Sequence, residues 1–195
     1  FLRKDGRSYN PITNCPKSLR RRMRLDGEAL READLGCSYW YFLSTQMPVG
    51  AERDRLVKAI GSGEFYERVA GTAGIYFPDR NSLKQECQRQ LLFGQDWRES
   101  QRPLWVGLQT LFPGLCRLID SLRYRYGVSG FAKYLMRLAG RLMDRVHKQL
   151  VDRGIHVIRL HDGMFVGESK VEEAADLMRS TGLELFGIEP RVKAK

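Results

Sequence analysis

Two short apolar runs near the C-terminus, residues 155–160 and 164–166, flank the corner His161-Asp162-Gly163. Asp-Gly between apolar runs is a strong hairpin signal, because glycine accepts the positive φ of a tight turn. We therefore predict a two-stranded unit with the Asp162 carboxylate at its tip. The simplest interpretation is that Asp162 only caps this turn, as aspartate often does.

A comparable pattern lies upstream. Residues 29–35 follow the turn pair Asp26-Gly27 and predict a strand that carries Asp34 near its end. An aromatic segment, residues 39–42, comes soon afterwards. A carboxylate in such an apolar setting is costly to bury unless it is paired or holds a cation.

Longer apolar runs have helical spacing. Residues 51–100 predict a helical region that is broken by Gly61-Ser-Gly63 and by Phe77-Pro78. Periodicity and cap residues also predict a helix over 82–93 capped by Asp79 or Asn81, a long amphipathic helix over 130–152, a helix over 172–181 ended by Gly182, and a last strand over 183–188. This order of elements predicts the α+β class, with a small antiparallel sheet backed by helices and a helical insertion.

The net positive charge of the chain indicates which class of partner it binds. A formal net charge of +10 over 195 residues indicates a polyanion. The basic residues are densest in residues 1–31, where Lys17, Arg20, Arg21 and Arg22 are expected to lie along nucleic-acid phosphates. A solvated basic surface is the alternative.

Two other features exclude further classes. No apolar run approaches the ~20 residues that span a bilayer, so no membrane partner is expected. The four cysteines are scattered, which argues against a zinc site or a disulfide framework and fits a reducing cytosol.

Asp34 and Asp162, each on strand-like support, are expected to meet across neighbouring strands. Mg²⁺ suits such a pair, because it commonly takes one or two protein carboxylates together with waters and substrate phosphates. Two ions ~4 Å apart would stabilise the attacking and leaving oxygens of an in-line displacement. The pair therefore predicts a site for two Mg²⁺ ions, with Mn²⁺ as the alternative ion.

The segments Asp34-Leu-Gly-Cys-Ser-Tyr39 and His161-Asp162 resemble the two metal-binding motifs in the palm of family A DNA polymerases and related single-subunit polymerases. Between them, residues 60–70 resemble the segment that follows the first motif. Residues 79–84, with Leu91-Leu-Phe-Gly94, resemble the fingers helix that binds the triphosphate.

This resemblance covers residues 28–190 and implies a polymerase-type palm with a helical fingers insertion. It also implies roles for individual residues. Asp34 and Asp162 would be the catalytic metal ligands, the backbone carbonyl of Leu35 a further metal ligand, Arg80 and Lys84 the groups that bind the triphosphate, Tyr39 the ring against the sugar of the incoming nucleotide, and His161 a neighbour of the primer terminus.

Simpler interpretations stay open for these side chains. Arg80 and Lys84 also fit a solvated basic face of an ordinary helix, and Tyr39 also fits a core position. The chain departs from the family where Gly163 replaces a frequent Glu. It departs again at Gln88 and Leu92, the positions at which the family carries an aromatic residue and a tyrosine.

The sequence thus predicts three regions: a nucleic-acid-contacting lead-in over 1–31, a palm over 32–50 and 101–195, and a fingers-like insertion over 51–100. The predicted activity is template-directed nucleotidyl transfer that extends a primer with dNTPs, as in phage or plasmid replication. The expected location is the cytoplasm of a bacterial or phage-infected cell, or the nucleoid, with a further domain or replication partner. The alternatives are a reverse transcriptase or RNA polymerase, a non-catalytic nucleic-acid-binding protein, and a metal-dependent nuclease.

Overall fold

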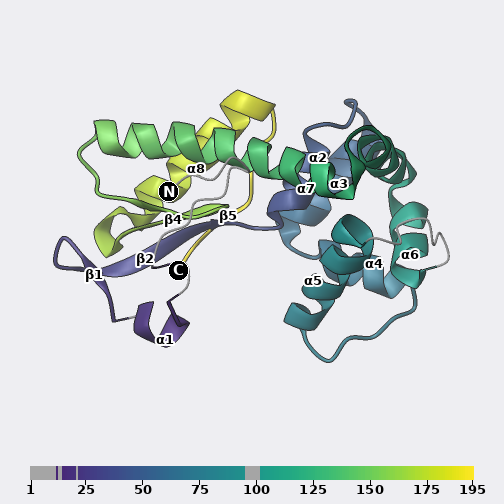
Figure 1. The fold of residues 1–195 in the computed structure, drawn as a ribbon, viewed down its shortest axis with the longest axis horizontal. Coiled ribbons are helices and arrows are strands. Elements are labelled where there is room, and N and C mark those ends of the chain that lie inside the picture. The colour runs from purple at the N-terminus through teal and green to yellow at the C-terminus, as the bar shows by residue number, and fades with distance from the viewer. Residues whose placement is uncertain (1–11, 13–14, 21, 95–101) are drawn as a thin grey trace. The chain divides into compact units, whose positions relative to one another are not determined.

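The computed structural model describes residues 12, 15–20, 22–94 and 102–195 (Figure 1). The described residues within 1–38 and 136–195 form a unit that contains the sheet, and the described residues within 39–135 form a second unit that is helical. We call them the sheet unit and the helical unit. The helical unit is one continuous insertion between the two segments of the sheet unit, and the fold is of the predicted α+β class.

These unit boundaries differ from the three regions assigned by sequence, which divide at 31/32, 50/51 and 100/101. The functional meaning of those regions stays a prediction.

The sheet is antiparallel in every described pair. Its strands lie in the order β1 (Arg24–Leu25), β2 (Glu28–Leu35), β4 (Gly163–Gly167) and β3 (Ile158–Arg159), and β5 (Val192–Ala194) also pairs with β2. The β1–β2 turn has positive φ at both central residues, Asp26 (55°) and Gly27 (81°), as a two-residue turn of this hand requires. The predicted strand that carries Asp34 and the predicted hairpin of β3 and β4 are confirmed.

One face of the sheet is covered by helices (Figure 1). Helix α8 (Val171–Phe186), entered through the short 3₁₀ helix η2 (Glu168–Lys170), contacts β2, β4 and β5. The C-terminal part of α7 (Pro113–Asp152) lies beside α8, where Arg153 pairs with Glu173 at 3.0 Å. Alternate residues of the central strands are buried toward these helices: Ala33, Leu35, Met164 and Val166.

The other face of the sheet is polar at one end and apolar at the other. Its apolar end is a small cluster of Leu30, Leu160 and Phe165, against which Ile12, Met23, Leu25 and Ile158 pack. The short helix α1 (Lys17–Arg20) lies on this side, since the Arg20 guanidinium is 5.6 Å from the centre of the Phe165 ring. The polar end carries Asp34.

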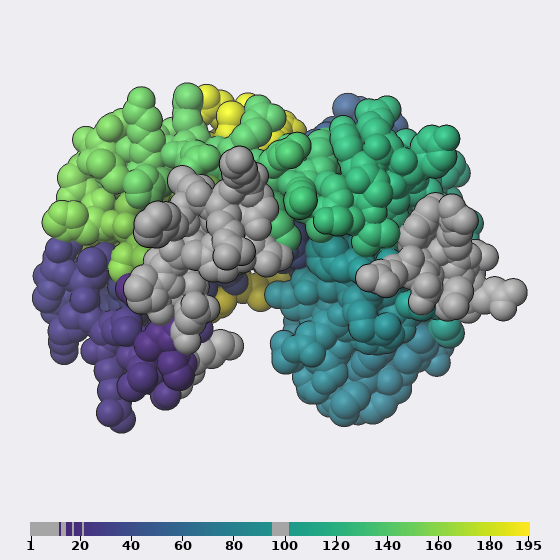
Figure 2. All heavy atoms as spheres, viewed as in Figure 1, coloured from purple at the N-terminus to yellow at the C-terminus, as the bar shows by residue number. Residues whose placement is uncertain are grey.

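The helical unit consists of α2 (Ser38–Ser44), α3 (Ala51–Ser62), α4 (Phe65–Thr72), α5 (Arg80–Gln88), the π-helical turn η1 (Arg89–Phe93), α6 (Pro103–Leu111) and the first part of α7. Figure 2 draws its side chains as closely packed spheres, teal for α4 and α5 and green for the first part of α7. Its core is aromatic: the Phe65 ring lies 4.5 Å from the Trp40 ring and 6.1 Å from the Phe112 ring, centre to centre. No helix in the described part of the chain has the length and apolarity needed to cross a membrane.

Helix α7 contains a kink at Gly127, where φ is 66° and ψ is 169°. The buried Arg123, one turn before this kink, donates a hydrogen bond to the Leu91 carbonyl in η1 at 2.9 Å. The predicted helix over 130–152 is the part of α7 that follows the kink.

The C-terminal assignments need correction. Gly182 does not end the last helix but is buried inside α8, which continues to Phe186 and ends at Gly187 with φ 70°. The predicted strand over 183–188 is therefore wrong, and the last strand is β5. A glycine inside a packed helix and a glycine at its end are alike in sequence, and only Gly187 has the left-handed conformation of a helix cap.

Helices α4 and α6 cross at Gly107. A Cβ atom at this position would lie 2.5 Å from the Val69 carbonyl oxygen and 2.9 Å from the Ala73 Cβ. Both obstacles are main chain or directly attached to it, so they cannot rotate away. The absence of a side chain at Gly107 therefore sets how closely these helices approach.

We expect Gly107→Ala to lower the free energy of unfolding by about 1–3 kcal/mol, because overpacking outweighs the better helix propensity of alanine. The matched control is Gly71→Ala in α4, where a Cβ meets nothing within 4 Å. That variant should be neutral or more stable by up to about 1 kcal/mol. Urea unfolding of both variants measures the difference, and equal effects would contradict the proposed close contact.

Candidate active site

Asp34 lies at the polar end of the open sheet face. It is the second-last residue of β2, opposite Gly163 of β4 and Lys193 of β5, and its side chain is 25% exposed. The carboxylate therefore stands on the central strand, with a partner strand on each side.

Asp162 lies directly before β4 and is joined to β2 through its main chain. The Leu35 N–H donates to the Asp162 carbonyl oxygen at 2.9 Å. The carboxylate is held separately, since the Ser38 hydroxyl at the start of α2 donates to Asp162 Oδ2 at 2.8 Å. The structure thus brings the segments of Asp34 and Asp162 side by side, although they are 128 positions apart in the sequence.

Gly163 permits this close pairing. A Cβ there would lie 2.6 Å from the Ala33 carbonyl oxygen and 3.2 Å from the Asp34 Cα. The prediction that Gly163 has a positive φ is wrong, because Gly163 is not among the residues with positive φ. Glycine is required at position 163 for a steric reason, because the main chain of β2 leaves no room for a larger residue directly after Asp162.

Sequence reasoning missed a third carboxylate, Glu32. It lies two residues before Asp34 and so on the same face of β2. Burial raises the pKa of Glu32 above its ordinary value, and the negative charges of Asp34 and Asp162 add to this effect. The alternation of a strand was the signal that could have revealed it.

Lys195 is the second missed residue. Its ammonium group donates to Asp34 Oδ2 at 2.9 Å and lies 4.0 Å from Glu32 Oε2. Burial alone would lower the pKa of Lys195, but the hydrogen bond to Asp34 and the charges of Asp34, Glu32 and Asp162 together raise it. A cation thus already sits against this carboxylate cluster, which consists of Glu32, Asp34 and Asp162.

The donor set fits a metal that is bound partly by substrate. In the described part of the chain, no group of three or more His, Cys, Asp and Glu side chains is arranged to hold a metal by itself. Mg²⁺ needs no such group, because it keeps waters and takes substrate phosphates beside one or two carboxylates. The predicted role of the Leu35 carbonyl as a further ligand stays a prediction.

The structure describes most of the other residues that are predicted to contact nucleic acid. Arg20 reaches the sheet face, where its charge acts on Glu32, and Arg22 is exposed. His161 is exposed in the turn before Asp162. Lys17 begins α1, and Arg21 lies outside the described residues.

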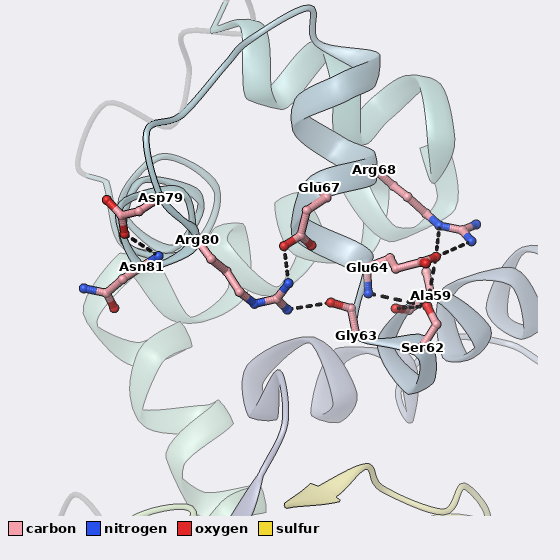
Figure 3. Close-up of polar contacts among 9 residues, drawn as sticks. All are labelled: Ala59, Ser62, Gly63, Glu64, Glu67, Arg68, Asp79, Arg80 and Asn81. Atoms are coloured by element: carbon pink, nitrogen blue, oxygen red, sulfur yellow. Dashed lines mark hydrogen bonds and ion pairs between the residues drawn. The ribbon is translucent and has the colours of Figure 1, made fainter.

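In the helical unit, Arg80 and Lys84 lie four residues apart on α5. Figure 3 shows that Asp79 caps this helix and that the Arg80 guanidinium contacts the Glu67 carboxylate and the Gly63 carbonyl. Lys84 is exposed. Of the two predicted triphosphate-binding groups, Arg80 is therefore held in an ion pair.

Tyr39 is half-buried, and its ring packs edge-on against Phe93 with 5.1 Å between ring centres. The sequence analysis did not single out Phe93. Counting along an α-helix from Lys84 assigns the family's aromatic residue and tyrosine to Gln88 and Leu92 instead. A π turn contains more residues than an α turn, and here η1 makes Leu92 fully buried and gives the contact with Tyr39 to Phe93, directly before Gly94.

The fold resembles that of a solved structure. The chain is similar to the POL domain of Pol1 from M. smegmatis in a complex with DNA primer-template and dNTP, with a TM-score of 0.60 and 16% sequence identity. The match covers 94% of this chain and 43% of the other, so the chain spans less than half the length of that neighbour. No protein-family model and no curated protein sequence matches. The fold of this chain is thus similar to part of the fold of that polymerase domain.

We expect Gly163→Ala to lower the free energy of unfolding by about 1–3 kcal/mol, since the added Cβ forces β4 away from β2. The control is Gly167→Ala at the other end of β4, where the obstacle is the carboxylate of the Glu28 side chain rather than main chain. Thermal unfolding should show a larger loss for position 163. A smaller loss there than at 167 would contradict the steric role of Gly163.

Proposed function

We propose that this chain is a template-directed nucleotidyltransferase that extends a nucleic-acid primer. The observation that carries the proposal is that Asp34 of β2 and Asp162, directly before the paired strand β4, are adjacent in a fold that is similar to part of a DNA polymerase domain. DNA primer-template and dNTPs are the proposed partners, by analogy with the complex of the structural neighbour.

Asp34 and Asp162 would hold divalent metal, Mg²⁺ or Mn²⁺, which when bound would lower the pKa of the primer 3′-hydroxyl and neutralise charge on the transferring phosphate. The protein's own contribution is positioning. Ser38 fixes one oxygen of Asp162, and the Leu35–Asp162 main-chain bond fixes the spacing of the two strands. No side chain needs to form a covalent intermediate.

Arg80 and Lys84 would bind the triphosphate, and Arg20 and Arg22 would contact backbone phosphates of the duplex. Triphosphate binding by Arg80 requires that it leave Glu67. This exchange is favourable, because an exposed ion pair of this kind contributes only about 0–1 kcal/mol, whereas a triphosphate offers several negative charges.

A second candidate is a nucleic-acid-binding protein without catalysis. It is favoured by one observation, that Lys195 already occupies the side of Asp34 on which a cation would bind. Primer extension with Mg²⁺, using dNTPs or rNTPs and DNA or RNA templates, separates the two candidates and identifies the template and sugar. Template binding with no extension under any of these conditions would favour the second.

We expect Asp34→Asn and Asp162→Asn to reduce extension by about 1,000-fold or more, the loss that about 4 kcal/mol of transition-state stabilisation produces. Binding of primer-template should change little, because Lys and Arg supply it. The control is Asp176→Asn on α8, an exposed aspartate paired with Arg179. Full activity in Asp162→Asn would return this residue to the role of a turn cap.

We expect Tyr39→Ala to raise the ratio of ribonucleotide to deoxynucleotide insertion roughly 30- to 150-fold, if a ring against the sugar excludes the 2′-hydroxyl by ~2–3 kcal/mol. Tyr39→Phe is the control, since it keeps the ring and its contact with Phe93. A purely structural Tyr39 would instead lower the melting temperature and both insertion rates together. An unchanged ratio in a folded Tyr39→Ala variant would rule out the sugar contact.

A further inference from the structure

The place of Lys195 is fixed by its main chain. Its N–H donates to the Glu32 carbonyl, and the Glu32 N–H donates to the Lys195 carbonyl, both at 2.9 Å. Residues that exchange two main-chain hydrogen bonds across antiparallel strands point to the same face of the sheet. Strand β5 therefore holds Lys195 on the face that carries Glu32 and Asp34.

The rest of β5 keeps this register. Val192, Lys193 and Ala194 pair with Leu35, Asp34 and Ala33, and the Gly36 N–H donates to the Arg191 carbonyl at 2.8 Å just beyond the strand. The ammonium group is thus tethered beside the carboxylate cluster and does not reach it from a long flexible segment.

The side chain of Lys195 binds one of the two Asp34 oxygens that could ligate a metal. Its Nζ donates to Asp34 Oδ2 at 2.9 Å, and the negative charges of Glu32, Asp34 and Asp162 attract its positive charge. A divalent ion bound to this oxygen at about 2.1 Å would lie close to the ammonium group, and like charges so near to each other repel strongly. The ammonium group and the ion therefore compete.

We propose that Lys195 is a tethered counter-ion that competes with divalent metal for Asp34 and keeps the metal affinity of the free protein low. The proposal rests on the proposed function only in taking Asp34 as a metal ligand. Lys195 offsets part of the negative charge of the carboxylate cluster when no metal is bound, and a metal ion that binds Asp34 Oδ2 must displace its side chain.

The test measures Mn²⁺ binding to the full chain without nucleotide or nucleic acid, from the electron paramagnetic resonance signal of the free ion. Lys195→Met removes the charge but keeps a side chain of similar length. It should bind Mn²⁺ about 10-fold more tightly than the unsubstituted chain, or tighter still. Lys148→Met, which removes an exposed charge from α7, should leave the affinity unchanged.

A second substitution locates the ion. Adding Asp34→Asn to Lys195→Met should abolish the gain, because the competing groups share Asp34. An unchanged or weaker Mn²⁺ affinity in Lys195→Met, or a gain that survives Asp34→Asn, would overturn the proposal. Thermal unfolding of each variant checks that the chain is folded at the temperature of the measurement.

Failure of this proposal and failure of the proposed function give different results. A Lys195-dependent change in Mn²⁺ affinity without primer extension leaves the counter-ion role intact and removes the polymerase. Primer extension with no change in Mn²⁺ affinity leaves the polymerase intact and removes the counter-ion role.

Discussion

The arrangement of the sheet unit depends on one close approach, that of β4 to β2 at Gly163. The Ala33 carbonyl occupies the space that a side chain at this position would need, so the strands can pair here only through glycine. This pairing places the Asp162 carbonyl within hydrogen-bond distance of the Leu35 N–H, immediately after Asp34. Two carboxylates from distant parts of the chain thereby share one end of the sheet. Their mutual repulsion must be offset, and the structure offsets it with Ser38 on one side and Lys195 on the other.

A second constraint lies in the corner between β2 and α2. Cys37 has a left-handed conformation, with φ 56°, which is uncommon for a residue with a side chain. This corner turns the chain so that Ser38 meets Asp162 as the first residue of α2. Tyr39 follows directly and packs on Phe93 within the helical unit. The six residues 34–39 therefore carry a metal-ligand candidate, the hydroxyl that holds the second carboxylate, Asp162, and a sugar-contact candidate.

The two central strands and their aspartates could be predicted from the sequence, for a physical reason. Strands β2 and β4 are predicted by turn residues beside β-prone runs. Asp34 and Asp162 are notable in the sequence because carboxylates are costly to bury in apolar settings. Glu32 was missed although strand alternation places it on the same face as Asp34. Lys195 was missed because its position on that face depends on the register of β5, which no local pattern encodes. Phe93 was missed because a π turn changes the residue count without a distinct sequence signal. Gly182 was misread as a cap because glycine serves both close packing and left-handed turns.

In the helical unit, local contacts limit how Arg80, one of the two residues proposed to bind the triphosphate, can move. Asp79 accepts hydrogen bonds from the main-chain N–H groups of Asn81 and Ser82, which fixes the first turn of α5. The Arg80 side chain leaves from this fixed turn, so the direction of its guanidinium is limited before any ligand binds. Its ion pair with Glu67 is half exposed and weak, so it orients Arg80 without holding it strongly. Lys84 lies one turn later on α5 and is exposed. An arginine that is oriented by a weak ion pair, beside an exposed lysine, would suit the triphosphate binding that we propose for this helix.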